Sequence, residues 1–280
     1  MICKRIQPAK EISEFIREYL LFHAVFDMTA NIPAKSYPVN PEEGIIFLIR
    51  GSLVAESPEL GTIHKRPKTF VFGIPSNRQN LSISNEYMMV CVRFQPGALF
   101  KLSGIPMTEL VHNYIDAELI LGGEIKTVHE QLANASNYES MPLILDNYFQ
   151  RKIHKLKKNE QPIDKIGSLI LKNPQGFNLE KTAGQACLSH RQFEKRFIRQ
   201  IGIPPKLFSR ICRFNQAYEL KEYSPHLNWF TIAVQTGYSD YQHLVKDFKQ
   251  FAGTLPNTFL QECQNNPERV LNLSAGFIGV

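Results

Sequence analysis

Polar side chains of the types that read base edges stand in two short segments of the C-terminal half. In the first segment, Arg191, Glu194 and Lys195 alternate with Phe193 and Phe197. This spacing predicts a helix with a buried aromatic face and an exposed polar face. Arginine and lysine donate hydrogen bonds to guanine, and glutamate accepts one from cytosine. The predicted chemistry is therefore hydrogen bonding in the major groove of DNA.

The second segment has the same arrangement. Leu244 and Phe248 predict its buried face, whereas Tyr241, Gln242 and Lys246 stay outside, and glutamine is suited to pairing with adenine. The expected DNA-binding residues are Ser189, His190, Arg191, Glu194, Lys195 and Arg199 in the first segment, and Ser239, Asp240, Tyr241, Gln242, Lys246 and Lys249 in the second.

Each of these residue types also has a plainer interpretation. Arg191 and Lys195 are equally what an ordinary solvated helix face carries, and a contact to phosphate is as compatible with them as a contact to a base. Aromatic side chains can stack on bases, but helical spacing favours packing in a core. The aromatic residues expected in the core are Phe193, Phe197, Phe248, Phe251 and Phe259, together with Trp229.

Each polar helix needs a partner helix and a tight turn to hold it. Residues 179–186 predict a short helix, with small Ala183 where two helices cross, and Cys187-Leu188 predicts the turn. Ser189 is the expected N-cap, and Gln192 three residues later completes a capping box. This order of elements is a helix-turn-helix unit.

The unit occurs twice. Ala183 recurs fifty positions later as Ala233, and Phe197 recurs fifty-one positions later as Phe248. In the second copy, residues 229–236 predict the short helix, Gly237-Tyr238 the turn, and Ser239 the N-cap, with Gln242 three residues on. A helix over 206–221 is expected between the copies, about 24 Å long at ~1.5 Å per residue. Two polar helices so joined could enter successive grooves, ~34 Å apart.

Charge separates the two halves of the 280-residue chain. Residues 1–150 hold 13 basic and 16 acidic side chains, a net charge of −3, whereas residues 151–280 hold 19 and 10, a net charge of +9. This difference predicts that only the second half meets a polyanion, without distinguishing DNA from RNA or a membrane. The basic run Arg151–Pro162 is the expected end of a helix running into a linker, or an arm that touches DNA.

The first half is predicted to be β-rich, with helices at its ends. Its predicted helices are 11–22, with Ile12, Phe15, Ile16 and Tyr19 on one face, 124–133 and 142–153. Gln95-Pro96-Gly97 is expected to end a strand and start a helix. The predicted strands are Gly44–Ile49, Thr69–Ile74, Leu81–Ser84 and Met88–Phe94.

Over Ile163 to Leu260 the chain resembles the AraC/XylS family of bacterial transcription regulators. The resemblance rests on Ala183, Leu188-Ser189, Phe193, Phe197, Gly202 and Pro205, and on Ile232-Ala233, Gly237-Tyr238-Ser239-Asp240, His243-Leu244, Phe248-Lys249, Gly253, Pro256 and Phe259. It implies base readout by Arg191, Glu194 and Lys195, and by Tyr241, Gln242 and Lys246. Cys187 stands where the family usually has glycine, and a left-handed backbone there costs about 1 kcal/mol.

The N-terminal half resembles the family's effector domain more weakly, over 93–98 and 102–106. The resemblance implies an α+β protein: a cupin-like β-barrel with flanking helices at 1–155, an all-α domain of two helix-turn-helix units joined by a linker helix at 156–265, and a tail at 266–280. It also implies double-stranded DNA and RNA polymerase as partners, a small-molecule effector, and a homodimer.

Other function classes lack residues that would support them. The five cysteines are widely spaced and expected to be reduced thiols, and His64, His112 and His129 form no metal-binding pair, so no metal or cofactor is expected. No apolar run approaches the ~20 residues of a membrane span, which leads us to expect a cytoplasmic protein. The sequence leaves three functions open: an effector-responsive regulator, a regulator whose first half only dimerises, and a cupin-type enzyme fused to a DNA-binding module.

Overall fold

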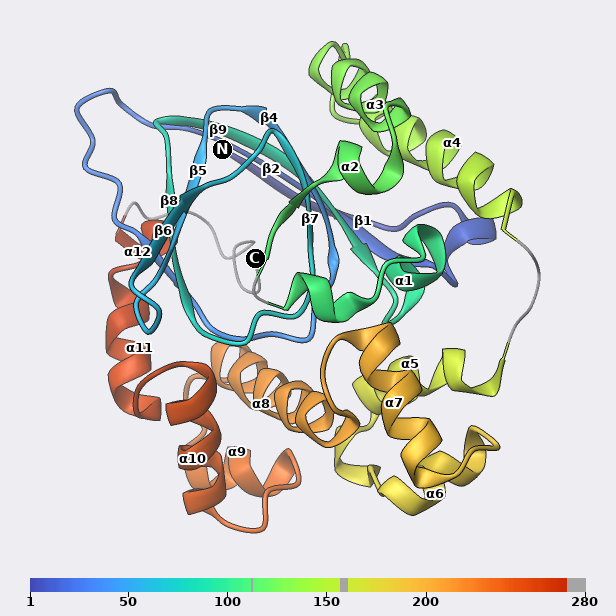
Figure 1. Ribbon diagram of the computed structural model, residues 1–280. Coiled ribbons are helices and arrows are strands. Elements are labelled where there is room, and N and C mark those ends of the chain that lie inside the picture. The colour runs from blue at the N-terminus through green and yellow to red at the C-terminus, as the bar shows by residue number, and fades with distance from the viewer. Residues whose placement is uncertain (112, 157–160, 271–280) are drawn as a thin grey trace.

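The N-terminal half of the chain is built from two antiparallel sheets (Figure 1). This computed structural model describes residues 1–111, 113–156 and 161–270. His112, part of the expected linker and residues 271–280 of the expected tail therefore lie outside the described residues.

The larger sheet has the strand order β1-β2-β9-β4-β7-β10, and the smaller sheet has the order β3-β8-β5-β6. Neighbouring strands in both sheets pair antiparallel. The strands are β1 (Ile2–Ile6), β2 (Ile16–Val25), β3 (Lys35–Tyr37), β4 (Gly44–Arg50), β5 (Leu53–Ser57), β6 (Thr62–Lys65), β7 (Thr69–Phe72), β8 (Gln79–Ile83), β9 (Glu86–Phe94) and β10 (Ile115–Asp116).

The larger sheet is buried on both faces. Leu20 of β2 packs toward the smaller sheet, in one cluster with Leu53 of β5. Leu21, which points to the opposite face of the same strand, packs in a cluster with Leu145 of a helix behind the sheet. The mixed α+β class is confirmed. The expected cupin-like barrel takes the form of two sheets packed together, and within the described ranges their pairing does not close into one ring.

The predicted helix over 11–22 is wrong. A short 3-10 helix, η1, covers Lys10–Ile12, and the chain then enters β2. Because both faces of β2 are buried, its apolar residues do not alternate with polar ones, and the run imitates a helical face. The four predicted strands match β4, β7, β8 and β9 to within two residues at each end.

Helices complete the N-terminal half. Gln95-Pro96-Gly97 ends β9 and starts α1 as predicted, with Gly97 at a φ of 83°. The predicted helix over 124–133 matches α3, and the one over 142–153 lies within α4. The helices are α1 (Ala98–Ser103), the 3-10 helix η2 (Met107–Leu110), α2 (Ala117–Leu121), α3 (Glu124–Ala133) and α4 (Ser140–His154).

The C-terminal half is helical throughout its described residues, with an aromatic core. Phe193, Phe197, Phe248, Phe251 and Phe259 are all buried in one cluster, which confirms that these rings pack in the core. The helices are η3 (Pro162–Lys165), α5 (Ile166–Lys172), η4 (Pro174–Gly176), α6 (Leu179–Gln185), α7 (His190–Ile201), α8 (Pro205–Tyr223), α9 (Trp229–Gln235), α10 (Tyr241–Phe251), α11 (Pro256–Gln264) and α12 (Pro267–Val270).

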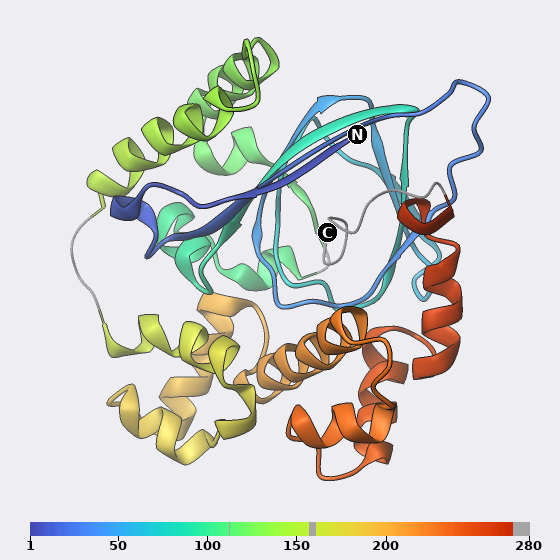
Figure 2. The same cartoon turned by 180° about the vertical axis from the view of Figure 1, so that it is seen from behind.

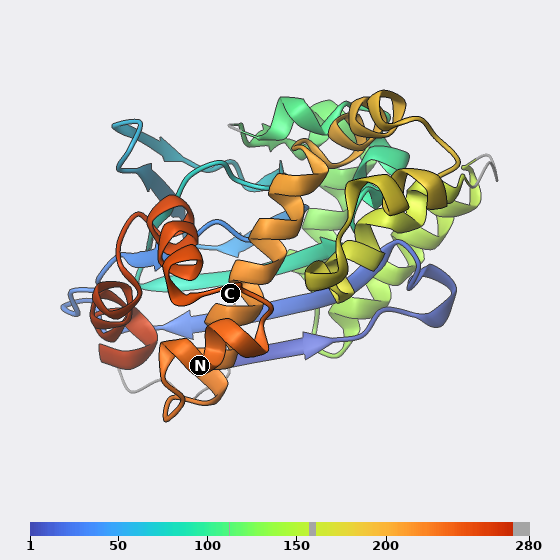
Figure 3. The ribbon, with the colours of Figure 1, turned by 90° about the horizontal axis from the view of Figure 1, so that it is seen from below.

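The long helix α8 connects two groups of helices. It is 19 residues long, three more than the predicted helix over 206–221. It runs below the sheets (Figure 2), and the view from below places α5–α7 on one side of it and α9–α12 on the other (Figure 3).

Candidate nucleic-acid interface

The first helix-turn-helix unit is α6 and α7. Asn178 caps α6 by accepting from the backbone N–H of Lys181 at 2.9 Å. The predicted capping box of α7 is confirmed: Ser189 Oγ accepts from the N–H of Gln192, whose side chain reaches back to the N–H of Ser189. Ala183 is buried where α6 meets α7, so the small residue serves the predicted close crossing.

The turn of the first unit holds Cys187 in a left-handed conformation. Its φ is +54°, and among the described residues no other non-glycine residue has a positive φ. In the second unit the corresponding residue is Gly237, with a φ of +76°. A Cβ at Gly237 would also lie 2.6 Å from Cγ of Gln175. Both the positive φ and this close approach therefore favour glycine at the position. The predicted cost of Cys187 therefore has a structural basis.

The second unit is α9 and α10, and its predicted cap is wrong by one residue. Asp240, not Ser239, caps α10, because its carboxylate accepts from the backbone N–H of His243 at 2.9 Å. This hydrogen bond is the main reason why the pKa of Asp240 is lowered. Ser239 Oγ instead lies 2.8 Å from Nδ1 of His243. Asp240 is as good a cap as serine, so residue type alone could not decide between these two neighbours.

The two polar helices α7 and α10 both contact the N-terminal half with their C-terminal ends. The last residues of α7 contact it: a Cβ on Gly202 would lie 2.9 Å from the carbonyl oxygen of Met107 in η2. The last residue of α10 does the same, because the carbonyl oxygen of Phe251 accepts from the N–H of Val39 at 2.9 Å. The first turns of both helices therefore point away from the sheets (Figure 1).

Most of the predicted DNA-binding residues are exposed on these free ends. Tyr241 is the exception, half-buried against the core of the C-terminal half. The exposed residues of α7 and its cap are Ser189, His190, Arg191, Glu194 and Lys195, and those of α10 and its flank are Ser239, Asp240, Gln242 and Lys246.

Arg199 and Lys249 lie apart from that group. Both are exposed, but each belongs to the second half of its helix. The Arg199 guanidinium carbon is 5.6 Å from the centre of the Phe100 ring in α1. Arg199 therefore faces the N-terminal half.

A buried carboxylate that the sequence analysis missed holds α10 against α8. Asp247 accepts from Arg210 in a very short contact and from Tyr238 Oη at 3.0 Å, and Arg213 lies 3.7 Å away. The Arg213 guanidinium also stacks over the Tyr238 ring, 4.1 Å from its centre. The sequence did contain a signal for this role. Asp247 shares a helical face with Leu244 and Phe248, and a charge on a buried face needs partners.

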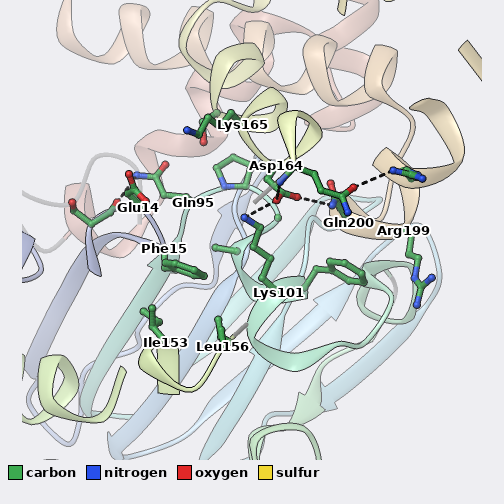
Figure 4. Close-up of a pocket in the computed structure, with 18 of the residues that line it drawn as sticks. Glu14, Phe15, Gln95, Lys101, Ile153, Leu156, Asp164, Lys165, Arg199 and Gln200 are labelled. Atoms are coloured by element: carbon green, nitrogen blue, oxygen red, sulfur yellow. Dashed lines mark hydrogen bonds and ion pairs between the residues drawn. The ribbon is translucent and has the colours of Figure 1, made fainter. Parts of the chain in front are cut away.

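A pocket of about 1110 Å³ lies beside the second half of α7, between it and the N-terminal half (Figure 4). Asp164 of η3 lies on its wall, where Lys101 pairs with it at 2.9 Å and Gln200 Nε2 donates to it at 3.0 Å. Arg196 donates to Gln161 beside them at 3.1 Å. These contacts fix the rear of α7 and leave its first turn free.

A second, smaller cavity lies between the two sheets. It has a volume of about 120 Å³ and walls that are mainly apolar. Arg66 lies at its polar part: the guanidinium stacks 3.3 Å from the centre of the Tyr114 ring and donates to Gln79 Oε1 at 3.3 Å. No carboxylate within the described ranges pairs with Arg66, whereas Arg93 pairs with Glu18 and Glu42.

The described residues contain neither a cluster of metal ligands nor a membrane-spanning helix. Over the residues that the structure describes, no three His, Cys, Asp or Glu side chains gather as metal ligands. Within the same ranges, no helix combines the length and the apolar character needed to cross a membrane.

Comparison with known sequence families gives two matches. A family described as a helix-turn-helix domain matches residues 182–262, and a domain of unknown function (DUF6597) matches residues 4–116. Comparison with curated proteins gives no match.

Several solved structures are similar to the chain. ToxT from Vibrio cholerae O395, bound to (E)-4-(8-methylnaphthalen-1-yl)but-3-enoic acid, is 13% identical, with 87% of this chain and 99% of that chain covered and a TM-score of 0.49. ToxT from Vibrio cholerae strain SCE256, bound to an unsaturated fatty acid, is 15% identical over 86% and 94%, with a TM-score of 0.46. The DNA-binding domain of AdpA, in complex with a target DNA, is 24% identical over 38% and 95%, with a TM-score of 0.35.

The two helix-turn-helix units and their exposed polar helices define a DNA-binding transcription regulator. The matched helix-turn-helix family model spans residues 182–262, a range that includes both polar helices α7 and α10 and the linker helix α8.

Proposed function

We propose that the first halves of α7 and α10 enter successive stretches of the major groove on one face of a DNA duplex. The shared orientation of the two helices carries this proposal: each rests its last residues on the N-terminal half and directs its first turn away from it. The 19 residues of α8 span about 28 Å between the units. One turn of DNA is ~34 Å, so the two first turns suit neighbouring groove segments.

The proposed base-reading residues lie in the first half of each helix, and all of them except half-buried Tyr241 are exposed. They are Arg191, Glu194 and Lys195 in α7, and Tyr241, Gln242 and Lys246 in α10. Ser189, His190, Ser239 and Asp240 surround the two helix N-termini, where backbone N–H groups favour phosphate, and Lys249 is suited to a phosphate farther along. Arg199 is the least suited, because it faces Phe100.

Selection of bound duplexes from a random pool tests this proposal. We expect two conserved half-sites with centres about 10 base pairs apart, one for each unit. As a control, the selection is repeated with the charge-reversed first unit Arg191→Glu/Lys195→Glu, which should enrich one half-site only. Enrichment of a single half-site by the unaltered protein would contradict binding by both units.

We also propose that the cavity between the sheets receives a small-molecule effector. Its apolar walls suit a hydrocarbon group, and the Arg66 guanidinium, which lacks a carboxylate partner among the described residues, suits an acidic end. An effector of this chemistry is an apolar molecule with one carboxylate.

Calorimetry with decanoate tests the effector site. We expect saturable binding that Arg66→Met weakens at least tenfold, because the charge-assisted hydrogen bonds to the carboxylate are lost. Lys65→Met is the matched control, since Lys65 is the exposed neighbour of Arg66 and does not line the cavity. Equal binding by both variants would exclude Arg66 as the anchor.

The remaining assignments follow from the resemblance to the AraC/XylS family. We propose an effector-binding domain at 1–155, a DNA-binding domain at 156–265 and a tail at 266–280, with RNA polymerase as a partner and action in the cytoplasm. Light scattering of the full chain over a range of concentrations tests the proposed homodimer, and a constant monomer mass would contradict it.

A further inference from the structure

The cavity between the sheets is too small for an ordinary ligand as it stands. Its volume of about 120 Å³ compares with ~300–1,000 Å³ for typical small-molecule sites. If the proposed effector binds there, one wall must therefore move. This inference rests on the effector site proposed above and concerns its regulation.

The wall formed by β3 is the one most readily displaced. β3 is a three-residue strand at the end of the smaller sheet, and three register pairs with β8 hold it. Its residues Lys35 and Tyr37 line the cavity, and Pro267 of α12 lines it beside them. The opposite wall belongs to β2 and β9, which pair along nearly their whole lengths.

This same wall anchors the second helix-turn-helix unit. The N–H of Ser36 in β3 donates to Oδ1 of buried Asn266 at 3.2 Å. Arg78, one residue before β8, donates to Ser36 Oγ at 2.8 Å and to the carbonyl oxygen of Ala252 at 3.1 Å. It also pairs with Glu262 of α11 at 2.7 Å.

The anchor continues to the end of the DNA-binding helix. Val39, two residues after β3, donates to the carbonyl oxygen of Phe251, the last residue of α10. One short segment, residues 35–39, thus lines the cavity on one side and on the other donates to Phe251 of α10 and to Asn266, between α11 and α12. We call residues 35–39 the shared wall.

We infer that the shared wall couples the cavity to the second helix-turn-helix unit, so that a molecule filling the cavity displaces Lys35–Val39 and Pro267 and loosens the hold on α10. By linkage, DNA held by that unit then changes the affinity of the cavity for its ligand by the same factor. The first unit rests on η2 and α1 instead.

A side chain that fills the cavity tests the coupling without a ligand. Leu81 of β8 lines the cavity, and its neighbour Ser82 is exposed and does not. In the full chain we expect Leu81→Trp to speed hydrogen exchange at the Ser36 and Val39 amides at least tenfold, because the acceptors on Asn266 and Phe251 move away. Ser82→Trp, the matched control, should leave both rates within twofold.

DNA-binding affinity measures whether the displacement reaches α10. We expect Leu81→Trp to change the Kd for the selected two-half-site DNA at least fivefold, and Ser82→Trp to leave it unaltered. Asn266→Ala, which removes one anchor without filling the cavity, should change the Kd in the same direction. Adding Leu81→Trp to it should then change the Kd less than in the unaltered chain.

Two results would contradict the coupling between the cavity and α10. Exchange rates at Ser36 and Val39 that stay within twofold in Leu81→Trp would overturn it, as would faster exchange with an unaltered Kd. Should Leu81→Trp not melt cooperatively, Leu81→Phe gives the same readouts with less added volume. The exchange measurement needs neither DNA nor effector, so failure of the proposed function, seen as absent DNA or decanoate binding, is recorded separately.

Discussion

Cys187 shows how one residue carries a cost that the fold imposes. The turn between α6 and α7 requires a φ of +54° at this position, as the turn of the second unit requires +76° at Gly237. Glycine adopts such angles freely, whereas a side chain crowds the following carbonyl oxygen. The thiol is exposed.

Cys187→Gly should therefore stabilise the protein by up to about 1 kcal/mol, the relief of left-handed strain less the added entropy of the unfolded chain. The free energy of unfolding in urea measures the change. Cys187→Ala is the control, because it removes the thiol but keeps the Cβ, and it should be nearly neutral. A stabilisation of equal size in both variants would assign the effect to the thiol.

Lys246 is the residue at which mutation best distinguishes a contact to a base from a contact to phosphate. It is exposed near the middle of α10, four residues after Gln242. We expect Lys246→Ala to cost about 1–3 kcal/mol of binding free energy and to relax base preference at one position of the second half-site. Competition binding against single-base variants of the selected DNA measures both effects.

The control is Lys126→Ala, which removes an exposed lysine of α3 in the N-terminal half. It should leave affinity and preference unaltered. A uniform loss across all sequences, with a salt slope shallower by about one, would instead make Lys246 a phosphate contact.

At the scale of elements, α1 starts on a buried carboxyl. Glu43 Oε1 accepts from the backbone N–H groups of Gly97 at 3.0 Å and Leu99 at 3.2 Å. Burial outweighs these two hydrogen bonds and raises the pKa of Glu43 to about 8. The group is therefore neutral in the folded protein at pH values where it is ionised in the unfolded chain.

The sign of the effect on stability follows from this difference. Because the pKa of Glu43 is higher in the folded protein, its contribution to stability is complete at pH values below the pKa of the unfolded chain. That contribution is lost as pH rises toward about 8. We expect the free energy of unfolding to fall across this window, and Glu43→Gln to flatten the fall, because glutamine keeps the acceptor and has no proton to lose. An equal pH slope in both proteins would show that Glu43 does not titrate in this range.

At the scale of the whole molecule, α8 and the N-terminal half hold the two polar helices in one relative placement. The last turn of α7 rests on η2, and the last turn of α10 rests on the shared wall. Insertion of about half a helical turn, ~5 base pairs, between the half-sites puts the second one on the opposite face of the DNA.

Affinity for the inserted DNA should therefore fall to that of a single half-site, as measured by gel shift with the unaltered protein. Spacer DNA of the original length with changed bases is the control and should bind normally. Undiminished affinity for the inserted DNA would mean that the units move independently.

The sequence determined the second half of the molecule better than the first. Capping residues, turns and aromatic spacing act within a few residues, so the helix-turn-helix units and their exposed residues could be placed almost to the residue. Asp240 in place of Ser239 is an error of one position between two good caps. β2 was taken for a helix because burial on both faces removes the alternation that marks a strand.

The tertiary structure alone decided how distant parts meet. Asn266 and Ser36 are 230 residues apart in the chain, and Arg78 and Ala252 are 174 apart. Hydrogen bonds at such separations depend on where the folded elements come to rest, which no local pattern of residue types encodes. The direction in which both polar helices point, the cavity between the sheets and the wall that joins that cavity to α10 all have this origin.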